Sequence, residues 1–374
     1  MTFLLIFSGC FFLFYMAMIL FAAYKINKPV LNVSNKNYSN NSYTIIVPFR
    51  NEMENLKLIY SNLLDLKFDQ QRFEVIFIDD NSSDGSFEWL EKCDMPPNFK
   101  LLTSLKIGKK QALIKAISKA SGSFIITTDA DCRLHPHWIK SIDETIESKN
   151  PKLIVQPVIT SFKNNPVYQF QYYDSLSLLG INLAIYNIRK QPTIASGANL
   201  VFQKEAFNKI EPYSDNVHIA SGDDMFLLRS FLKHDPNSVI LNYSPENLVV
   251  TKSENSWFKL VKQRMRWAGK MKRFNNTTSF YLGLFSVIIQ VILIVFLVLG
   301  LWHQNYYLSV FVFSWLAKSG VDFIFFSKIA QQIGQRVSWF NVFMLELFYM
   351  IFVPLIVVFS LFKSPKWKGR KIVN

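Results

Sequence analysis

Two aspartates, Asp129 and Asp131, stand one residue apart directly after a short apolar run over residues 123–126. A run of this length and composition is typical of a buried β-strand. Carboxylates at the carboxyl end of such a strand face the crevice in which open α/β sheets bind ligands. Oxygen ligands in this pattern can hold a divalent cation, and the cation can hold a diphosphate. The alternative is a polar loop that caps the following helix, because Asp-x-Asp is also common by chance.

A second pair, Asp79 and Asp80, ends another apolar run, residues 74–78, and precedes a turn that contains Asp84 and Gly85. Capping of the next helix is one explanation for an acidic residue here. We expect Asp84 to be the capping residue. Capping cannot readily account for both members of the pair at the strand end.

Two further positions combine charge with the start of a helix. Lys109 opens a helical stretch that reaches about Ala120, and a helix amino end with an ammonium favours phosphate. A solvated charge is the alternative there. Asp223 and Asp224 open a helix that reaches about Lys233. An acidic pair is electrostatically favoured at that end, so capping alone would explain one of the two.

The elements around these residues alternate between strands and helices with short turns. This order predicts an α/β domain with a doubly wound, mostly parallel sheet and right-handed crossovers. Residues 162–190 mix aromatic, aliphatic and basic residues, which predicts an amphipathic helix pair near a membrane surface or over a binding site, or a helix packed on the sheet. Strands are expected over 44–49, 74–78, 99–104, 123–128 and 152–157, and helices over 55–66, 86–92 and 108–120.

The apolar half of the 374 residues, which includes 35 Phe, clusters at the two chain ends. Residues 3–24 carry no charge and are long enough to span a bilayer. A cleaved signal peptide is the alternative, although a basic start is lacking. Lys25 and Lys28 follow the run, so the next domain is expected in the cytoplasm. The net charge is +14, and the basic residues flank apolar segments. This arrangement favours a membrane over nucleic acid as the partner.

Three more apolar segments lie near the carboxyl end, at 281–302, 306–326 and 340–362. The middle one holds Lys318 and Asp322, which would either neutralise each other or serve a function. The tail after residue 362 is basic and is expected in the cytoplasm, but three full crossings would place it outside. We therefore expect one segment, 306–326, to lie in the interface or to re-enter. The three cysteines have neither a disulfide pattern nor metal-ligand spacing, and a reducing compartment fits them.

Six stretches in chain order resemble the family 2 glycosyltransferases, whose nucleotide-sugar-binding α/β domain is of the GT-A type. The last resembles the Gln-x-x-Arg-Trp signature of membrane-bound members, such as ceramide and carotenoid glucosyltransferases and polysaccharide synthases. The stretches are residues 45–52, 78–85, 108–113, 129–131, 221–224 and 263–267. The resemblance implies a transmembrane helix at 1–25, a linker at 26–42, a cytoplasmic catalytic domain at 43–275, membrane segments at 280–362 and a tail at 363–374.

The resemblance also implies roles on the donor side. Asp131 would ligate Mg²⁺ or Mn²⁺, and Asp129 would hold the ribose or share the metal. Asp80, or its neighbour Asp79, would accept the imide N–H of uracil. The remaining nucleotide-binding positions implied are Glu52, Lys109 and Arg266.

On the acceptor side, the resemblance makes Asp224 the general base, with Asp223 beside it, that accepts the proton of an acceptor hydroxyl. Gln263 and Trp267 fall at i and i+4 on one helix face and would line the acceptor site. An amphipathic helix that binds anionic lipid is the alternative for this basic stretch. Ser196 and Gly197 belong to a small-residue strand, 195–202, that would floor the acceptor pocket.

Together these features predict a multi-pass enzyme of the cell membrane with a cytoplasmic catalytic domain. It would transfer a sugar, with inversion, from a nucleoside-diphosphate donor, expected to be UDP-linked, to a membrane lipid or lipid-linked acceptor. A processive polysaccharide synthase is the alternative in the same family, although the membrane segments are few for a secretion channel. A non-catalytic membrane binding protein on a degenerate transferase scaffold is the alternative of another class. The sequence predicts no nucleic-acid partner and leaves the oligomeric state open.

Overall fold

The computed structural model describes residues 2–26, 40–104, 108–217, 219, 222–273, 277–302, 305–362, 366–367 and 370–371. Lys28, most of the expected linker and Ser221 lie outside these residues. The chain forms two compact units. The sheet unit comprises Pro29–Ser161 and Ile185–Lys252, and the helical unit comprises Met1–Lys28, Phe162–Ala184 and Ser253–Asn374.

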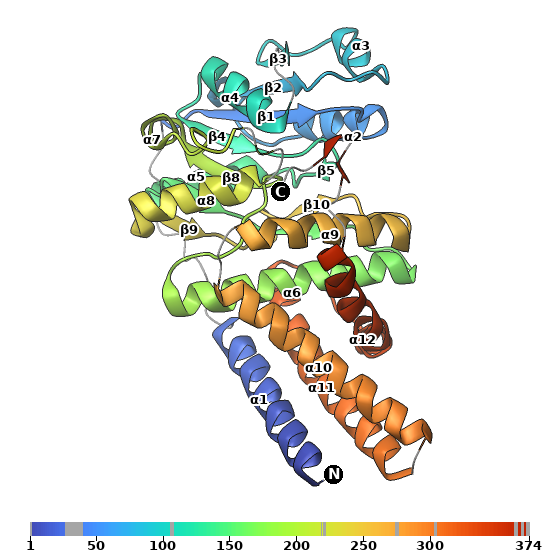
Figure 1. Ribbon diagram of the computed structural model, residues 1–374. Helices are drawn as coiled ribbons and strands as arrows, with labels where there is room; N and C mark the ends of the chain where they lie inside the picture. Colours follow the sequence, from blue (N-terminus) through green and yellow to red (C-terminus); the bar gives the residue numbers. More distant parts are fainter. Residues whose placement is uncertain are drawn as a thin grey trace. The chain divides into compact units, whose positions relative to one another are not determined.

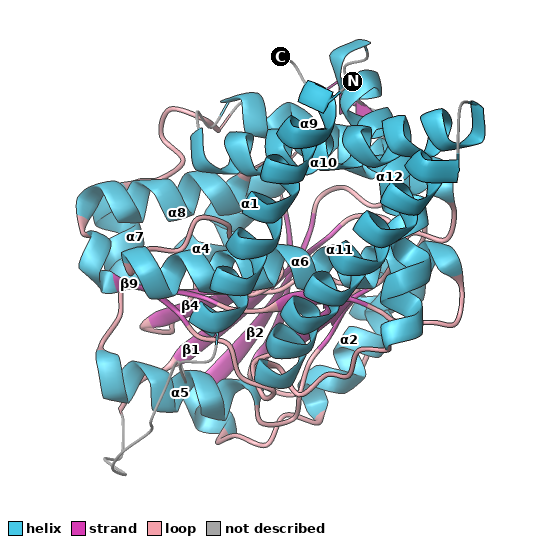
Figure 2. Cartoon of the chain, turned by 90° about the horizontal axis from the view of Figure 1, so that it is seen from below, coloured by secondary structure: helices cyan, strands magenta, loops and turns pink. Residues whose placement is uncertain are grey.

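A seven-stranded sheet organises the sheet unit, in the order β3-β2-β1-β4-β8-β6-β9. All neighbours are parallel except β8, which runs antiparallel to β4 and to β6. Figure 2 shows β1, β2 and β4 running alongside one another. The strands are β1 (Tyr43–Phe49), β2 (Phe73–Asp79), β3 (Phe99–Thr103), β4 (Phe124–Thr127), β6 (Leu153–Val155), β8 (Leu200–Gln203) and β9 (Val239–Leu241).

Helices cover both faces of this sheet, because side chains of alternate strand residues point to opposite faces. Ile45 and Val47 of β1 pack in one core with α2 and α5, and Ile46 packs in the other core with α4 and α8. The strands are therefore apolar on both sides, as expected of a buried parallel sheet. The helices are α2 (Met53–Leu64), α3 (Ser86–Glu91), α4 (Lys109–Lys119), α5 (Trp138–Lys149), α7 (Lys204–Ile210) and α8 (Asp223–His234).

A second, three-stranded sheet lies in the same unit. It joins β5 (Cys132–Arg133), β10 (Val249–Thr251) and β7 (Val158–Thr160). Strand β5 directly follows the Asp129–Asp131 segment and pairs with β10, with Cys132 opposite Thr251. This pairing brings a distant part of the chain next to the acidic segment.

The helical unit contains four helices that are long and apolar enough to cross a membrane, and α1, α10 and α11 lie side by side (Figure 1). Their candidate spans are Ile6–Ile26, Gly283–Trp302, Asn305–Gln332 and Trp339–Val358. The helices are α1 (Thr2–Ile26), α10 (Thr277–Trp302), α11 (Asn305–Gln332) and α12 (Trp339–Phe362), together with α9 (Trp257–Arg273) and the greater part of α6 (Pro166–Arg189).

The structure corrects the expected helix pair over 162–190, because α6 is one continuous helix. Gly180, its only glycine, does not break it; instead it permits close packing. A Cβ at Gly180 would lie 2.5 Å from the Phe325 ring of α11. Phe170 stacks on Tyr349 of α12 with ring centroids 4.5 Å apart. These contacts explain why residues 162–184 group with the apolar helices, although the sequence prediction placed them inside a catalytic domain at 43–275.

Helix α11 also departs from one expectation. A re-entrant segment needs a turn within the membrane, and α11 is helical without interruption from Asn305 to Gln332. That form of the prediction for residues 306–326 is wrong, and an interfacial position stays a prediction. The expected pair within the helix is present, since the Lys318 ammonium lies 2.5 Å from Asp322.

Candidate active site

The predicted acidic residues of the sheet unit follow neighbouring strands. Strands β2, β1 and β4 are adjacent and parallel, so their carboxyl ends lie on one edge of the sheet. Asp80 follows β2, Glu52 follows β1, and Asp129 follows β4. This edge is where open α/β sheets bind ligands.

The two aspartates after β2 have different surroundings. Asp79 accepts hydrogen bonds from the backbone N–H and the hydroxyl of Ser82, and so stabilises its own turn. Asp80 is buried and accepts a 2.6 Å hydrogen bond from the N–H of Gly108, which adopts a φ of 129° suited to glycine. Asp84 accepts from the N–H of Ser86 at the start of α3, although the N-cap position of that helix is Gly85 and not Asp84. Recognition of a nucleobase by Asp79 or Asp80 stays a prediction.

Lys109 joins two of the predicted acidic groups. Its ammonium lies 2.6 Å from Asp129 Oδ1 and 3.6 Å from Asp223 Oδ2. Burial alone would lower the pKa of Lys109, but the attraction of Asp129, Asp223 and Asp224 outweighs burial and raises it. The ammonium therefore remains charged between the two loops.

Gly197 lies against the same group. A Cβ there would stand 3.0 Å from Asp223 Oδ2 and 3.4 Å from Lys109 Nζ. Any larger side chain would press on the ion pair. Gly197 and Ser196 form a loop that precedes β8, so the expected strand over 195–202 begins only at Leu200. The predicted acceptor-floor residue and the predicted base pair are thus neighbours.

Asp131 lies among other carboxylates. Burial, followed by repulsion from Asp129 and Glu52, raises the pKa of Asp131 to about 6. Thr251 of β10 donates a 3.2 Å hydrogen bond to Asp131 Oδ2 and partly offsets that rise. A bound cation would favour the charged form of these carboxylates. In the described part of the chain, no group of three or more His, Cys, Asp or Glu is arranged to hold a metal ion by itself.

A buried tyrosine hydroxyl bonds to the backbone at the start of α8. The Tyr213 hydroxyl donates to the carbonyl oxygen of buried Asp223 at 3.3 Å. Asp224 is less buried and accepts a 2.8 Å hydrogen bond from the N–H of Met225. Burial, followed by the nearby charges of Asp223 and Asp224, raises the pKa of Tyr213, so its hydroxyl remains a neutral donor. The catalytic role of Asp224 stays a prediction.

The remaining predicted residues belong to α9 of the helical unit. The Gln263 amide lies 3.5 Å from Glu254, and the Trp267 ring stacks beneath the Arg264 guanidinium at 4.1 Å. Arg264 pairs with Asp174 of α6 at 2.5 Å. The side chain of Arg266 lies outside the described part of the structure. The acceptor and diphosphate roles of these residues stay predictions.

Residues 44–211 match the family described as Glycosyl transferase family 2. The match covers 168 of the 374 residues, and we call this segment the transferase domain after the family that it matches. The transferase domain contains Asp80, Lys109, Asp129 and Asp131, and the match ends before Asp223. The expected resemblance to family 2 is therefore confirmed for this segment, and the Gln-x-x-Arg-Trp resemblance stays a prediction.

Two curated relatives are both named undecaprenyl-phosphate 4-deoxy-4-formamido-L-arabinose transferase. The protein of Photorhabdus laumondii is 32% identical over 108 residues, which are 28% of this chain and 33% of that protein. The protein of Proteus mirabilis is 30% identical over 111 residues, which are 29% of this chain and 34% of that protein. The matches span about a third of each relative's length.

The fold has a close counterpart among solved structures. The mannosyltransferase PcManGT from Pyrobaculum calidifontis, solved in complex with GDP-Man and Mn²⁺, gives a TM-score of 0.61 at 16% identity. The alignment covers 96% of this chain and 97% of that one. The expected mixed α/β fold of the GT-A type, with apolar helices at both chain ends, is thereby confirmed.

Sequence reasoning missed several residues around this site. Thr251 and Tyr213, which bond to Asp131 and to the Asp223 backbone, carry no motif and stand far from their partners in sequence. Asp174 and Glu254 were likewise not predicted as partners of α9. Only Asp174 could have been found from the sequence, because it is an acidic residue within a helix rich in aromatic residues.

Proposed function

We propose that this protein is a membrane-bound glycosyltransferase that moves a sugar from a UDP-linked donor to a membrane lipid or lipid-linked acceptor. The observation that carries the proposal is the ion pairing of Lys109 with Asp129 and Asp223 beside Gly197. It brings together a predicted nucleotide-binding residue, the neighbour of the predicted base and a predicted acceptor-site residue at one edge of the sheet. The four apolar helices and the lipid phosphate in the relatives' names support a lipid acceptor.

On the donor side, Asp80 would accept from the nucleobase and Lys109 would balance the diphosphate. Asp131 and Asp129 would hold Mg²⁺ or Mn²⁺, because their carboxylates and Glu52 repel one another and a divalent cation would offset that repulsion. When bound, such a metal neutralises the leaving diphosphate. Mn²⁺ in the PcManGT structure supports a divalent ion of this kind.

On the acceptor side, an acceptor oxygen would attack the anomeric carbon as the bond to the diphosphate breaks, with inversion of configuration. Asp224 would take the proton if the acceptor is a hydroxyl. Asp223 would hold Lys109 in place from the buried start of α8. Gln263, Trp267 and Arg266 would complete the acceptor and diphosphate contacts.

A lipid phosphate is the second candidate acceptor, and the names of the curated relatives favour it. A phosphate oxygen is already ionised near neutral pH, so its attack needs no general base. The two acceptors therefore make opposite demands on Asp224.

The test uses the full chain in detergent or lipid vesicles. UDP release is measured with a panel of UDP-sugars, Mg²⁺ or Mn²⁺, and either a membrane lipid extract or a polyprenyl phosphate. We expect Asp224→Asn to keep UDP binding and to lose about 10²–10⁴-fold in transfer to a hydroxyl acceptor. Exposed Asp215→Asn serves as the matched control and should behave as wild type.

The outcomes separate the candidates. Full activity of Asp224→Asn on every acceptor removes Asp224 from the role of base. Activity lost on hydroxyl acceptors but kept on a polyprenyl phosphate would identify the phosphate as a substrate that bypasses the base. No metal-dependent UDP release with any UDP-sugar and lipid would contradict the proposed UDP-linked transfer.

We also infer a multi-pass position in the cell membrane, with the transferase domain in the cytoplasm. Lys25 at the end of α1 supports that side by the positive-inside rule. A single cysteine is introduced at Lys371 on a background without native cysteines. Its labelling in intact cells shows on which side of the membrane the tail lies. Four full crossings would leave this position labelled from outside, whereas an interfacial α11 would protect it.

A further inference from the structure

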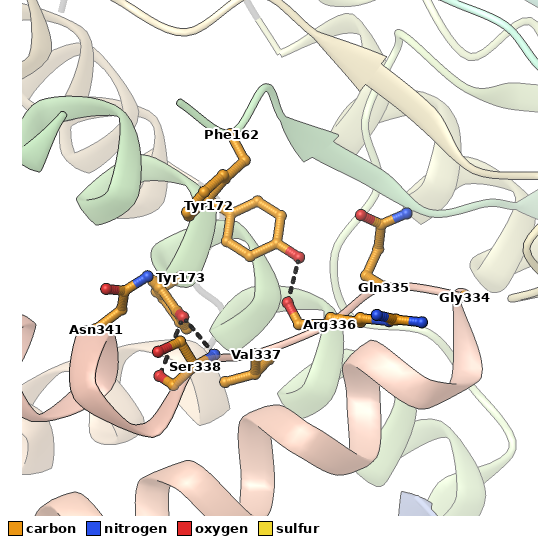
Figure 3. Close-up of a pocket in the computed structure, with 9 residues that line it drawn as sticks. All are labelled: Phe162, Tyr172, Tyr173, Gly334, Gln335, Arg336, Val337, Ser338 and Asn341. Atoms are coloured by element: carbon orange, nitrogen blue, oxygen red, sulfur yellow. Dashed lines mark hydrogen bonds between the residues drawn. The ribbon is translucent and has the colours of Figure 1, made fainter. Parts of the chain in front are cut away.

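The helical unit contains a cavity of about 530 Å³ between α6 and the loop that joins α11 to α12 (Figure 3). We refer to it as the loop cavity. Phe162, Tyr172 and Tyr173 form one side, and residues 334–338 with Asn341 form the other. None of these residues belongs to the predicted transfer machinery.

The aromatic wall and the loop hold each other in place. The Tyr172 hydroxyl donates to the Arg336 carbonyl at 3.2 Å, and the Ser338 N–H donates to the Tyr173 hydroxyl at 3.2 Å, as Figure 3 shows. The Phe162 and Tyr172 rings meet edge to face with centroids 5.1 Å apart. Because the loop is bonded through its backbone, its side chains remain available to a ligand. The loop cavity is therefore formed before anything binds.

Arg336 is the one charged side chain among the nine that line the loop cavity. It is exposed, and no described carboxylate forms an ion pair with it within 4.0 Å. Arg264, in the same unit, pairs with Asp174 at 2.5 Å. A guanidinium presents a planar fork of donors that matches phosphate. The cavity thus combines a single cation with an aromatic wall.

The loop lies where two apolar helices end. It joins the candidate spans Asn305–Gln332 and Trp339–Val358, so it stands at a membrane surface whether α11 crosses the bilayer or lies along its interface. Trp339 and Phe340, which open α12, are 48% and 60% exposed. Exposed aromatic residues at the end of a span are typical of the headgroup level of a bilayer.

We propose that the loop cavity binds the phosphodiester headgroup of an anionic membrane lipid. Arg336 contacts the phosphate, and Phe162 and Tyr172 pack against the glycerol region. A free phosphate ion would satisfy Arg336 but would leave the aromatic wall without a partner, whereas an amphiphile satisfies both. The site rests on the membrane position proposed above and does not depend on the transfer reaction.

The test uses the purified full chain in a neutral detergent and counts bound lipid by native mass spectrometry. The probes are dioleoylphosphatidylglycerol, the zwitterionic dioleoylphosphatidylcholine and inorganic phosphate. We expect one phosphatidylglycerol to bind in preference to phosphatidylcholine, and Arg336→Gln to weaken that binding about tenfold. Arg336→Lys should lose less, because it keeps the charge but not the fork.

Lys328→Gln is the matched control, because Lys328 is a basic residue near the same end of α11 that does not line the loop cavity. It should bind phosphatidylglycerol as the wild type does. Equal binding of the two lipids, or unchanged binding in both Arg336 variants, overturns the proposal. Displacement of the lipid by an equal concentration of inorganic phosphate also overturns it, in favour of a free-anion site. Lipid binding without any sugar transfer would remove the proposed function and leave this site standing.

Discussion

Each unit of the protein places one lysine between two carboxylates. In the sheet unit, the Lys109 ammonium lies 2.6 Å from Asp129 and 3.6 Å from Asp223 of α8. In the helical unit, the Lys318 ammonium lies 2.5 Å from Asp322 and also bonds to Glu346. The local chemistry is the same, but the surroundings differ.

Exposure distinguishes the two groups. The Lys109, Asp129 and Asp223 side chains are 22%, 37% and 12% exposed, whereas none of the Lys318 group exceeds 6%. Solvent can replace a partner lost from the first group, and a ligand can enter it. Nothing can replace a partner lost from the second, where Tyr15 of α1 also donates to Asp322. The comparison indicates a ligand site in one unit and a connection between α1, α11 and α12 in the other.

The largest effect is expected from Lys318→Met. It leaves two carboxylates buried without a cation, and breaking a buried pair costs about 3–5 kcal/mol. The midpoint of thermal unfolding in detergent measures the loss. Lys252→Met, which removes an exposed pair with Glu54, should change stability by less than about 1 kcal/mol. An unchanged midpoint in Lys318→Met would end the distinction between the groups.

The variant that combines Lys318→Met with Asp322→Leu and Glu346→Leu sharpens the same point. It removes all three charges of this group, and apolar replacement of a buried ionic group is often neutral or stabilising. We expect it to recover most of the midpoint lost by the single variant. Failure to recover would mean that the ionic contacts themselves hold the helices together.

Lys109→Met should act on binding and leave folding nearly intact. Its neighbours are partly solvated, so we expect stability to change by no more than about 1 kcal/mol. Loss of a charged contact to diphosphate should weaken UDP binding about 10- to 100-fold. Calorimetric titration with UDP and Mn²⁺ measures this, with exposed Lys119→Met on the same helix as the control. Normal UDP affinity would mean that Lys109 only holds Asp129 and Asp223.

Gly197→Ala probes how closely the Lys109 group is packed. The added methyl would stand 3.0 Å from Asp223 Oδ2, so the carboxylate must move and the transfer rate should fall about tenfold. Gly283→Ala is the control, because a Cβ at that position meets nothing within 4 Å. A fall in the unfolding midpoint without a change in rate would show that the contact is structural.

The smallest effect is expected at Glu74. Its ion pair combines a buried carboxylate with an exposed ammonium. Glu74 accepts from Thr44, from Ser121 and, at 2.6 Å, from Lys100, which is 47% exposed. Burial alone would raise the pKa of Glu74, but these hydrogen bonds outweigh burial and lower it. Glu74→Gln should cost about 1 kcal/mol at neutral pH.

The lowered pKa of Glu74 makes the stability of the folded protein depend on pH. A lowered pKa in the folded state stabilises the protein above the unfolded value of about 4.3, and the contribution is lost as pH falls through the folded pKa. The unfolding midpoints of wild type and Glu74→Gln should therefore converge as pH drops below about 4. A constant gap between them would contradict the assignment.

Local patterns in the sequence were enough to predict most of the elements. The apolar runs before Asp80 and Asp129 are strands β2 and β4, and the uncharged segments at both ends are long helices. The Lys318–Asp322 pair was also predictable, because residues four apart share a helix face. Each inference needed only the period of a strand or a helix.

Partners that lie far apart in the chain were decided by the tertiary structure. Nothing in the sequence indicates that Lys109 pairs with Asp129 and Asp223, that Thr251 bonds to Asp131, or that Glu346 joins Lys318. Residues 166–189 likewise form one helix, whose aromatic side chains pack on α11 and α12. Such contacts depend on the path of the whole chain, and that path follows from burying both faces of the sheet and packing the apolar helices together.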